Sequence, residues 1–265
     1  MPDAFFEPDG DGFLATELTR GPWDPDAQHA GPPAALIARE LERLGAGEEG
    51  EEPPWRFGRV TFEIMRSVPI ARLTVSARVV RPGRTVALCE ASLADAEGEV
   101  MRATAWRLRP KPVELPPFEA GPDEPPRGPE EAEPGDFLPT GQEVGYHTAM
   151  EYRPVAGGFT EPGPATVWMR MRHPLVAGEQ PTPLQRVMVA ADSGNGVSAT
   201  LDWSHFLFIN VDLTVHLHRL PETDWVCLDA VTRPETSGLG LSDTLLRDER
   251  GRIGRALQTL LVGQR

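Results

Sequence analysis

The chain repeats itself at a nearly constant offset, and this limits its possible folds more than any other feature. The segment beginning Asp95-Ala-Glu-Gly98 is matched by Asp248-Glu-Arg-Gly251, an offset of 153 residues. Two further landmarks recur in the same order at an offset of 152: Val80-Arg81-Pro82 at Thr232-Arg233-Pro234, and Pro69 at Pro221. An internal repeat of this length indicates a duplicated folding unit. A chain of 265 residues is long enough for two such units.

A segment dense in proline and glutamate separates the two units. Residues 110–140 have no apolar period and carry much of the negative charge. Such a composition predicts an extended linker on the surface. We therefore expect a first unit over residues 1–109, a linker over 110–140 and a second unit over 141–265.

Each unit begins with a short extended stretch and a helix, followed by four extended runs. Apolar residues at helical spacing predict helices over residues 32–44 and 183–192. The second has a clear start, with Thr182 as N-cap, Pro183 at the first position and Gln185 completing a capping box. The extended runs are 58–66, 72–80, 85–94 and 100–108, then 205–216, 225–232, 240–246 and 253–262. A helix followed by an antiparallel meander predicts an α+β unit, a sheet curled around one helix.

Charge and composition exclude several classes of function. The net charge of −14 would repel a phosphate backbone or an anionic membrane, so we expect no nucleic-acid or membrane partner. No apolar run is long enough to span a bilayer, and the acidic N-terminus does not have the form of a secretory signal. Cys89 and Cys227 sit in apolar runs without metal-binding spacing, which is typical of buried free thiols in a reducing cytoplasm.

The order of elements resembles the hotdog fold, in which an antiparallel sheet wraps a central helix. Two hotdogs in one chain resemble the acyl-CoA thioesterase II family, the double-hotdog thioesterases. The resemblance is strongest in Gln28-His29-Ala30-Gly31-Pro32, which looks like the start of the first hotdog helix, and in residues 192–258. It implies two tandem antiparallel sheets, each around a central helix. It also implies hydrolysis of an acyl-thioester such as acyl-CoA without a cofactor, and a homo-oligomeric assembly.

The resemblance also implies the catalytic residues, all in the second unit. The family uses an Asp on the second helix, a Thr on the following strand and a Gln on the last strand. The Asp matches Asp192, the Gln matches Gln258, and the Thr position falls at Asn210. Asn in place of Thr is a departure, because an amide replaces a hydroxyl, although an amide can also hold a water molecule.

Asp192 stands out without the family. Its spacing of four from Met188 and eight from Leu184 puts the carboxylate on the buried stripe of the helix, where an unpaired charge is costly. The alternative is that Asp192 caps the glycine-rich turn after the helix. Taken singly, Gln258 could be a core amide and Asn210 could pin a strand edge. The matching positions of the first unit, by landmark alignment, are apolar or uncharged: Leu41, Thr61 and Ala105.

Thioester hydrolysis needs an activated water and a donor for the oxyanion. Asp192 could take the proton of the water, with Gln258 and Asn210 orienting it. The oxyanion donor would come from the N-terminus of the first helix, with Gly31 supplying an N–H and allowing close approach. His29 could line the substrate site, although a lone histidine is more often structural or exposed. No set of side chains has the spacing of a metal site.

Two other functions stay open at this point. One is hydration or dehydration of an enoyl-thioester, which calls for a histidine with an acid. The other is binding of acyl-CoA without catalysis. Because coenzyme A is anionic, any of these functions needs a local basic patch on an acidic protein.

Overall fold

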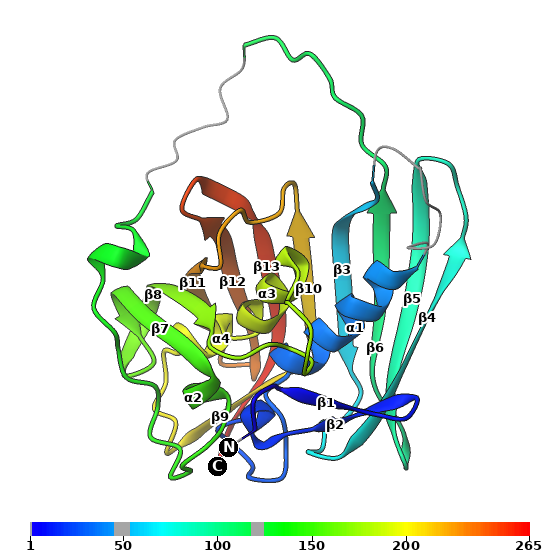
Figure 1. Cartoon of the computed structure of the whole chain (residues 1–265). Helices are drawn as coiled ribbons and strands as arrows, with labels where there is room; N and C mark the ends of the chain where they lie inside the picture. The colour runs from blue at the N-terminus through cyan, green and yellow to red at the C-terminus, as the bar shows by residue number, and fades with distance from the viewer. Residues whose placement is uncertain (1, 45–53, 118–124) are drawn as a thin grey trace.

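The computed structural model describes residues 2–44, 54–117 and 125–265 and forms one continuous antiparallel sheet (Figure 1). The first unit contains β1 (Phe6–Asp9), β2 (Gly12–Ala15), η1 (Glu17–Thr19), α1 (Gly31–Arg43), β3 (Arg56–Ile64), β4 (Arg72–Arg81), β5 (Val86–Asp95) and β6 (Gly98–Leu108). The second contains η2 (Pro129–Glu131), α2 (Tyr146–Ala149), β7 (Met150–Gly158), β8 (Glu161–Met171), α3 (Pro183–Ala191), α4 (Gly194–Val197), β9 (Phe206–Asn210), β10 (Asp212–Leu217), β11 (Val226–Pro234), β12 (Leu239–Asp248) and β13 (Gly251–Gln264).

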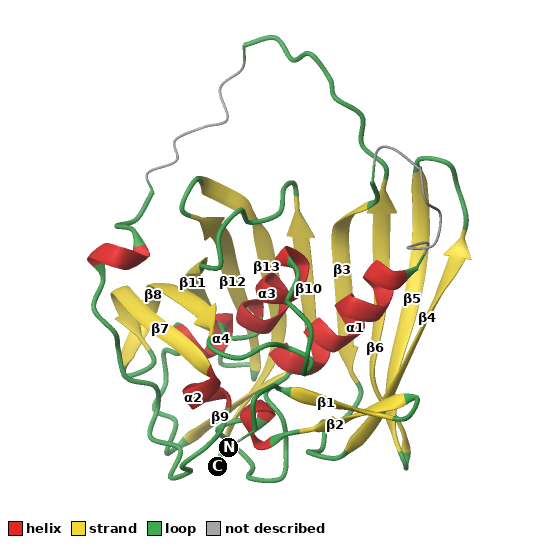
Figure 2. Ribbon diagram, viewed as in Figure 1, coloured by secondary structure: helices red, strands yellow, loops and turns green. Residues whose placement is uncertain are grey.

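The strand order confirms the double hotdog. It runs β1-β2-β4-β5-β6-β3-β10-β13-β12-β11-β8-β7, with β9 also paired to β13. The two units meet where β3 lies antiparallel to β10, so their sheets stand side by side. Figure 2 shows α1 and α3 together on one side of the curved sheet. Their apolar faces share one core cluster that draws on both units.

The sheet register tests the alignment of the two units. Thr61 pairs with Thr214 across the centre of the sheet, and their offset is again 153. The same offset relates the pair Cys89–Ala105 to the pair Ser242–Gln258. Ala105 is therefore the counterpart of Gln258, as predicted.

The predicted match of Thr61 with Asn210 is wrong. Asn210 pairs with Leu260, and the counterpart of Leu260, Arg107, pairs with Phe57. Phe57 is therefore the counterpart of Asn210. The match with Thr61 uses an offset of 149 residues, whereas the offset of 153 that relates the rest of the two sheets also relates Phe57 to Asn210. The β13 ladder has an extra residue at Val211, and the first unit has the same irregularity between Phe57 and Arg59, so the constant offset holds across it.

Both central helices and all the predicted strands are present, with ends that differ by a few residues. The run expected over 205–216 is divided into β9 and β10 at Val211. The stretch before α3 is longer than expected, since it forms α2 and the hairpin of β7 and β8. Pro154 and Pro164 conceal this hairpin in the sequence. Pro154 lies in the edge strand β7, where proline is tolerated, and Pro164 lies in β8 just outside the part that pairs with β11.

The linker is more than an extended connection on the surface. Residues 118–124 lie outside the described residues, but the part beyond them packs on the second unit. Trp168 Nε1 donates to the carbonyl of Arg127 at 2.8 Å, and the ring of Phe137 stacks on that of Phe159 at 4.4 Å. Apolar residues within the Pro/Glu-rich segment therefore contribute to the fold.

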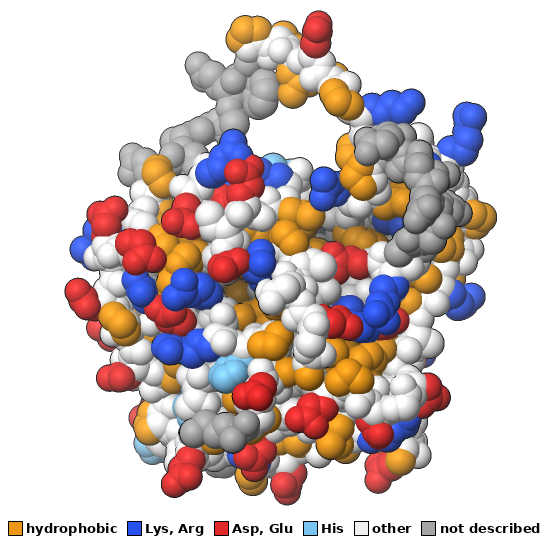
Figure 3. All heavy atoms as spheres, viewed as in Figure 1, with side chains coloured by type: hydrophobic (Ala, Val, Ile, Leu, Met, Phe, Trp, Pro, Cys, Tyr) orange, Lys and Arg blue, Asp and Glu red, His pale blue; other side chains and the backbone are white. Residues whose placement is uncertain are grey.

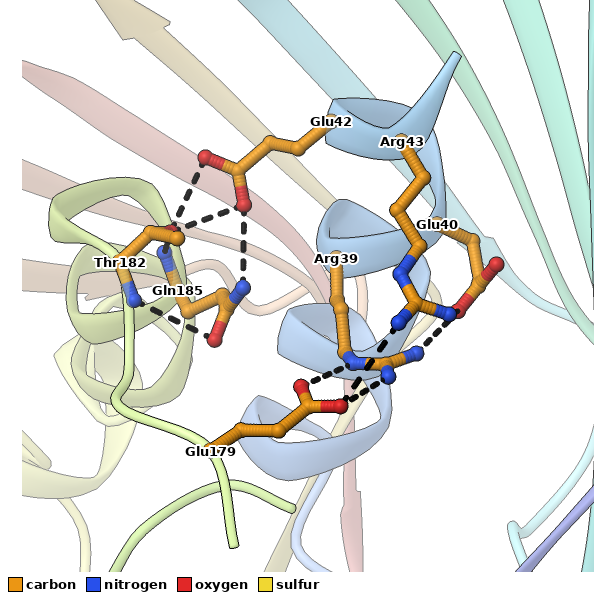
Figure 4. A network of polar contacts seen from close by, with 7 residues as sticks. All are labelled: Arg39, Glu40, Glu42, Arg43, Glu179, Thr182 and Gln185. Atoms are coloured by element: carbon orange, nitrogen blue, oxygen red, sulfur yellow. Dashed lines mark hydrogen bonds and ion pairs between the residues drawn. The ribbon is translucent and has the colours of Figure 1, made fainter. Parts of the chain in front are cut away.

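The helices α1 and α3 pack against each other in opposite directions. Near the start of α1, Gly31 lies so close to α3 that an added Cβ would come within 2.3 Å of the Val189 carbonyl oxygen. At the other end, Glu42 of α1 accepts hydrogen bonds from Thr182 Oγ1 at 2.8 Å and Gln185 Nε2 at 3.1 Å (Figure 4). Thr182 and Gln185 form the predicted capping box of α3.

An ion pair also links α1 to the segment that precedes α3. The buried guanidinium of Arg39 donates through Nε to Glu179 Oε2 at 2.7 Å (Figure 4). Burial disfavours the charged form of Arg39, but its interactions with Glu179 and Glu40 together outweigh this effect, and its pKa is raised. In the described part of the chain, no helix is long and apolar enough to cross a membrane.

Candidate active site

A cavity of about 530 Å³ opens where the two units and the linker meet. This volume lies within the usual range for small-molecule sites. Most of its wall is apolar, formed by Trp23, Ile64, Met65, Val68, Phe137, Leu138, Phe159, Phe208, Ile209 and Val211. The polar groups gather at one place in the wall and include four of the predicted residues: His29, Asp192, Asn210 and Gln258.

Asp192 is the centre of this polar group. It follows the last residue of α3, and its carboxylate is buried. Oδ1 accepts hydrogen bonds from Asn210 Nδ2 at 2.8 Å and Gln258 Nε2 at 3.0 Å. Oδ2 lies 3.1 Å from Nδ1 of His29. Asp192 does occupy the C-cap position of α3, but its carboxylate interacts with side chains far apart in the sequence rather than with the adjacent turn.

Gln258 is fixed at both ends of its amide. Its Nε2 faces the side-chain and backbone oxygens of Asp192, and its Oε1 accepts from the backbone N–H of Asn195 at 3.0 Å. Gln258 is a satisfied core amide, and it also positions the carboxylate.

Asn210 occupies the last position of β9, just before the irregularity at Val211. The turn of the chain there directs the amide Nδ2 toward Asp192. In the described structure Oδ1 of Asn210 has no protein partner and is not sealed from solvent. This oxygen is therefore available to accept a hydrogen bond from a water molecule in the cavity.

His29 lies at the centre of the site, although the sequence favoured a structural or exposed position for it. Its ring stacks on Tyr146, with centroids 3.8 Å apart and planes inclined by 2°. The Tyr146 hydroxyl is held by the Val189 carbonyl at 2.8 Å and by Ser193 Oγ at 2.9 Å. Burial lowers the pKa of His29 from 6.5, and the charge of Asp192 only partly opposes this effect. His29 is therefore neutral at pH 7.

Nδ1 of His29 lies beside one hydrogen-bond donor and one hydrogen-bond acceptor. The backbone N–H of Gly31 lies 3.1 Å away and can only donate, whereas the Asp192 carboxylate lies 3.1 Å away and accepts. When Nδ1 is unprotonated, it accepts the hydrogen bond from the Gly31 N–H. When Nδ1 is protonated, it donates a hydrogen bond to the Asp192 carboxylate. The two side chains therefore form an acid–base couple across which one proton can move.

Gly31 does not offer the free N–H that was predicted for it. That N–H donates to His29, and Gly31 lies behind the cavity wall, against α3. His29 and Ala30 line the cavity in its place. Glycine is required at position 31 because the two helices approach closely there.

At the corresponding positions of the first unit, Leu41, Phe57 and Ala105 stand in place of Asp192, Asn210 and Gln258. Leu41 and Phe57 instead line a smaller cavity of about 170 Å³. Ala105, the counterpart of Gln258, is fully buried in the core. The polar constellation thus belongs to one end of the helix pair, as the sequence predicted.

Two residues of the site were not found from the sequence. Asn195 holds Gln258 through its backbone, and Tyr146 supports His29 from the segment before β7. Asn195 could have been predicted as a site residue from the sequence, because it is only three residues from Asp192 in a glycine-rich turn. Tyr146 gave no signal, because its contact depends on the tertiary fold.

The fold and the cavity together define a class of protein: a double hotdog in which the second unit supplies a carboxylate beside the helix start of the first. Two family models match the chain. The acyl-CoA thioesterase N-terminal domain matches residues 19–108, and the acyl-CoA thioesterase C-terminal domain matches residues 122–262. The chain belongs to the acyl-CoA thioesterase family.

Solved structures agree with this fold at low sequence identity. A hotdog-fold protein of unknown function from Alicyclobacillus acidocaldarius is 16% identical, with a TM-score of 0.71 over 99% of this chain and 97% of that chain. The TesB protein of Mycobacterium avium subsp. paratuberculosis is 15% identical, with a TM-score of 0.65 over 97% and 95%. The acyl-CoA thioesterase II TesB2 of Mycobacterium marinum is 12% identical, with a TM-score of 0.63 over 97% and 93%. No curated protein sequence matches the chain.

The lowered pKa of His29 predicts that the protein becomes less stable in mild acid. In the unfolded chain a histidine takes up a proton near pH 6.5, whereas the folded state resists protonation of His29. Stability from this group is therefore complete above about pH 6.5 and is lost as pH falls toward the folded pKa. We expect the free energy of unfolding, measured with urea from pH 8 to pH 5, to fall less in His29→Gln than in the parent. Equal slopes would contradict a depressed pKa.

The two-ended bonding of Gln258 predicts a combined defect in Gln258→Ala. Truncation leaves the buried N–H of Asn195 unpaired, which costs about 1–3 kcal/mol of stability. It also frees the Asp192 carboxylate, so we expect kcat for thioester hydrolysis to fall by roughly 10–1,000-fold. Urea titration and steady-state kinetics would measure the two effects. Full activity in a folded variant would show that Gln258 serves the core alone.

Proposed function

We propose that this protein hydrolyses acyl-CoA thioesters to a free acid and coenzyme A. The observation that carries the proposal is the Asp192 carboxylate, which is buried in the wall of an apolar cavity, is held by Asn210 and Gln258 and lies 3.1 Å from Nδ1 of His29. A buried charge of this kind is costly unless it is paired. Its position beside a cavity, rather than in the core, supports a chemical role.

The geometry supports general-base hydrolysis. A water molecule beside Asp192 donates one hydrogen to the carboxylate and the other to the free oxygen of Asn210. As its oxygen attacks the thioester carbon, its proton passes to Asp192. The C–S bond then breaks, and the proton is returned to the sulfur, directly or through His29, so that coenzyme A leaves as a thiol. No cofactor takes part in this sequence.

A second function is favoured by one observation. Hydration of an enoyl-thioester needs a histidine beside an acid, and His29 stands 3.1 Å from Asp192. A panel of saturated and enoyl-CoA substrates separates the possibilities. Release of free thiol supports hydrolysis, whereas loss of enoyl absorbance without thiol release supports hydration. Saturable binding with neither change would leave an acyl-CoA-binding protein.

The substrate class follows from the shape and charge of the cavity. The apolar wall suits an acyl chain, and Arg20 and Arg66 supply positive charge among the lining residues. On the face shown in Figure 3 basic and acidic side chains are interspersed, so an anionic ligand can find local positive charge on an acidic protein. We also propose a cytoplasmic location, in keeping with the free, buried Cys89 and Cys227.

We further propose that copies of the chain associate, as the family resemblance implies. Ile209, Leu261 and Leu239 lie side by side on neighbouring strands, and each is at least half exposed. A row of this kind is a plausible contact surface. Light scattering at micromolar concentration should give the mass of a dimer or a larger assembly, and Leu261→Lys should lower it. A monomer mass for the parent would overturn this part of the proposal.

Asp192→Asn tests the proposed mechanism. The new amide oxygen can still accept from Asn210 and Gln258, but the side chain cannot take a proton at neutral pH. We expect kcat to fall by about 100- to 10,000-fold. Stability should hold or rise, because a buried charge is removed. Substrate affinity should also survive, since it rests on the cavity wall.

Glu42→Gln is the matched control for this variant. Glu42 is also a half-buried carboxylate between α1 and α3, but it bonds to Thr182 and Gln185 at the opposite end of the helix pair. Its removal should leave kcat near that of the parent. An Asp192→Asn variant with parental turnover would exclude Asp192 as the base and move a site built on His29 ahead.

A further inference from the structure

Thioester hydrolysis places a negative charge on the carbonyl oxygen, and a preorganised donor must meet it. The N–H of Gly31 is engaged with His29. The first turn of α1 cannot supply the next two donors, because Pro32 and Pro33 have no N–H. Of the residues at the helix start, Ala30 lines the cavity and keeps a backbone N–H, and a further donor is sought among the side chains of the cavity wall.

Asn195 presents a free amide to that cavity. It lies in α4, three residues after Asp192, and is one of the lining residues although only 7% exposed. Its Oδ1 lies 3.5 Å from Thr232 Oγ1. Across the described ranges no protein group pairs with Nδ2, and this atom is not sealed from solvent.

The inner face of the sheet beneath α4 is built to hold this residue. Ser198 Oγ donates to the Gly194 carbonyl at 2.8 Å and lies 2.8 Å from Thr232 Oγ1. Gly194 sits so close to the sheet that an added Cβ would come within 2.3 Å of Thr244 Oγ1. The turn containing Asn195 is therefore fixed in place.

The first unit provides an internal comparison. At the offset of 153, the register matches Thr232, Ser242 and Thr244 of the second unit with Val79, Cys89 and Ala91 of the first. The hydroxyl groups under α4 thus occur only in the unit that carries Asp192. The helix of the first unit continues through Leu41, the counterpart of Asp192, whereas in the second unit α3 ends at Ala191 and α4 begins at Gly194.

We propose that Nδ2 of Asn195 donates to the thioester oxygen as it becomes an oxyanion. This inference rests on the proposed hydrolysis and adds a catalytic residue to it. The backbone N–H of Asn195 anchors Gln258, so one residue would join the water-activating group to the oxyanion donor. Thr232 acts as a positioning residue, since its hydroxyl contacts the amide oxygen.

Asn195→Ala separates the two functions of this residue. The substitution removes the amide but keeps the backbone N–H, so Gln258 and Asp192 remain in place. We expect kcat/KM for acyl-CoA hydrolysis to fall by about 100- to 1,000-fold. Thr232→Val, which introduces the residue of the first unit, should cost about 5-fold, the equivalent of one ordinary hydrogen bond.

Two ligands distinguish oxyanion binding from a structural role. An S-alkyl-CoA thioether has no carbonyl, so its affinity should be the same for the parent and Asn195→Ala. A trifluoromethyl ketone analogue of acyl-CoA forms a tetrahedral, ionisable adduct, and its affinity should fall by about the same factor as kcat/KM. If Asn195→Ala does not fold, Asn195→Leu, which keeps the size without the donor, replaces it.

The outcomes separate this inference from the proposed function. A parent protein that releases no thiol from any acyl-CoA overturns the hydrolysis itself. An active parent with an equally active Asn195→Ala variant overturns only the role of Asn195. Equal loss of affinity for both analogues assigns Asn195 to the shape of the pocket and also overturns its role as the oxyanion donor.

Discussion

The site depends on the antiparallel contact between α1 and α3. Neither helix carries a complete site, because His29 precedes α1 and Asp192 follows α3. The two meet because Gly31 allows α1 to approach the backbone of α3 at Val189, where any side chain would collide. The helix contact sets the geometry of the site as well as stabilising the fold, because a small shift there would separate His29 from Asp192. Catalytic geometry is sensitive to displacements of that size.

The two ends of this helix pair are equivalent by the internal duplication but differ in use. At one end, a carboxylate after α3 meets a histidine before α1, beside a cavity of about 530 Å³. At the other end, the Glu42 carboxylate of α1 meets the start of α3, where Thr182 and Gln185 hold it. Burial raises the pKa of Glu42, and the hydrogen bonds oppose that effect. One carboxylate therefore faces a substrate-sized space, while the other helps to fix the distance between the helices.

Placing Asp192 in the wall of an apolar cavity requires a supporting polar structure. Gln258 and Asn210 hold one carboxylate oxygen, and Asn195 in turn holds Gln258. Hydroxyl groups on the inner face of β11 and β12 continue this support below α4. A partly satisfied network of this kind would cost more than an apolar core. This explains why the polar residues gather in one unit, while the other keeps Leu41, Phe57 and Ala105.

Periodicity and repeat spacing are local properties of the chain, so the sequence predicted the duplication, the two α+β units and the buried position of Asp192, whereas Gln258 was named as a site residue through the family resemblance. Helix starts followed from the same local chemistry, as the capping box at Thr182 shows. The strand register was not available from the sequence, and Asn210 was therefore matched with Thr61 at an offset of 149 rather than with Phe57 at the offset of 153 that the register sets. The role of His29 also depended on the tertiary structure: burial against Tyr146 and the approach of Asp192 decide its protonation, and both come from residues more than 100 positions away in the chain.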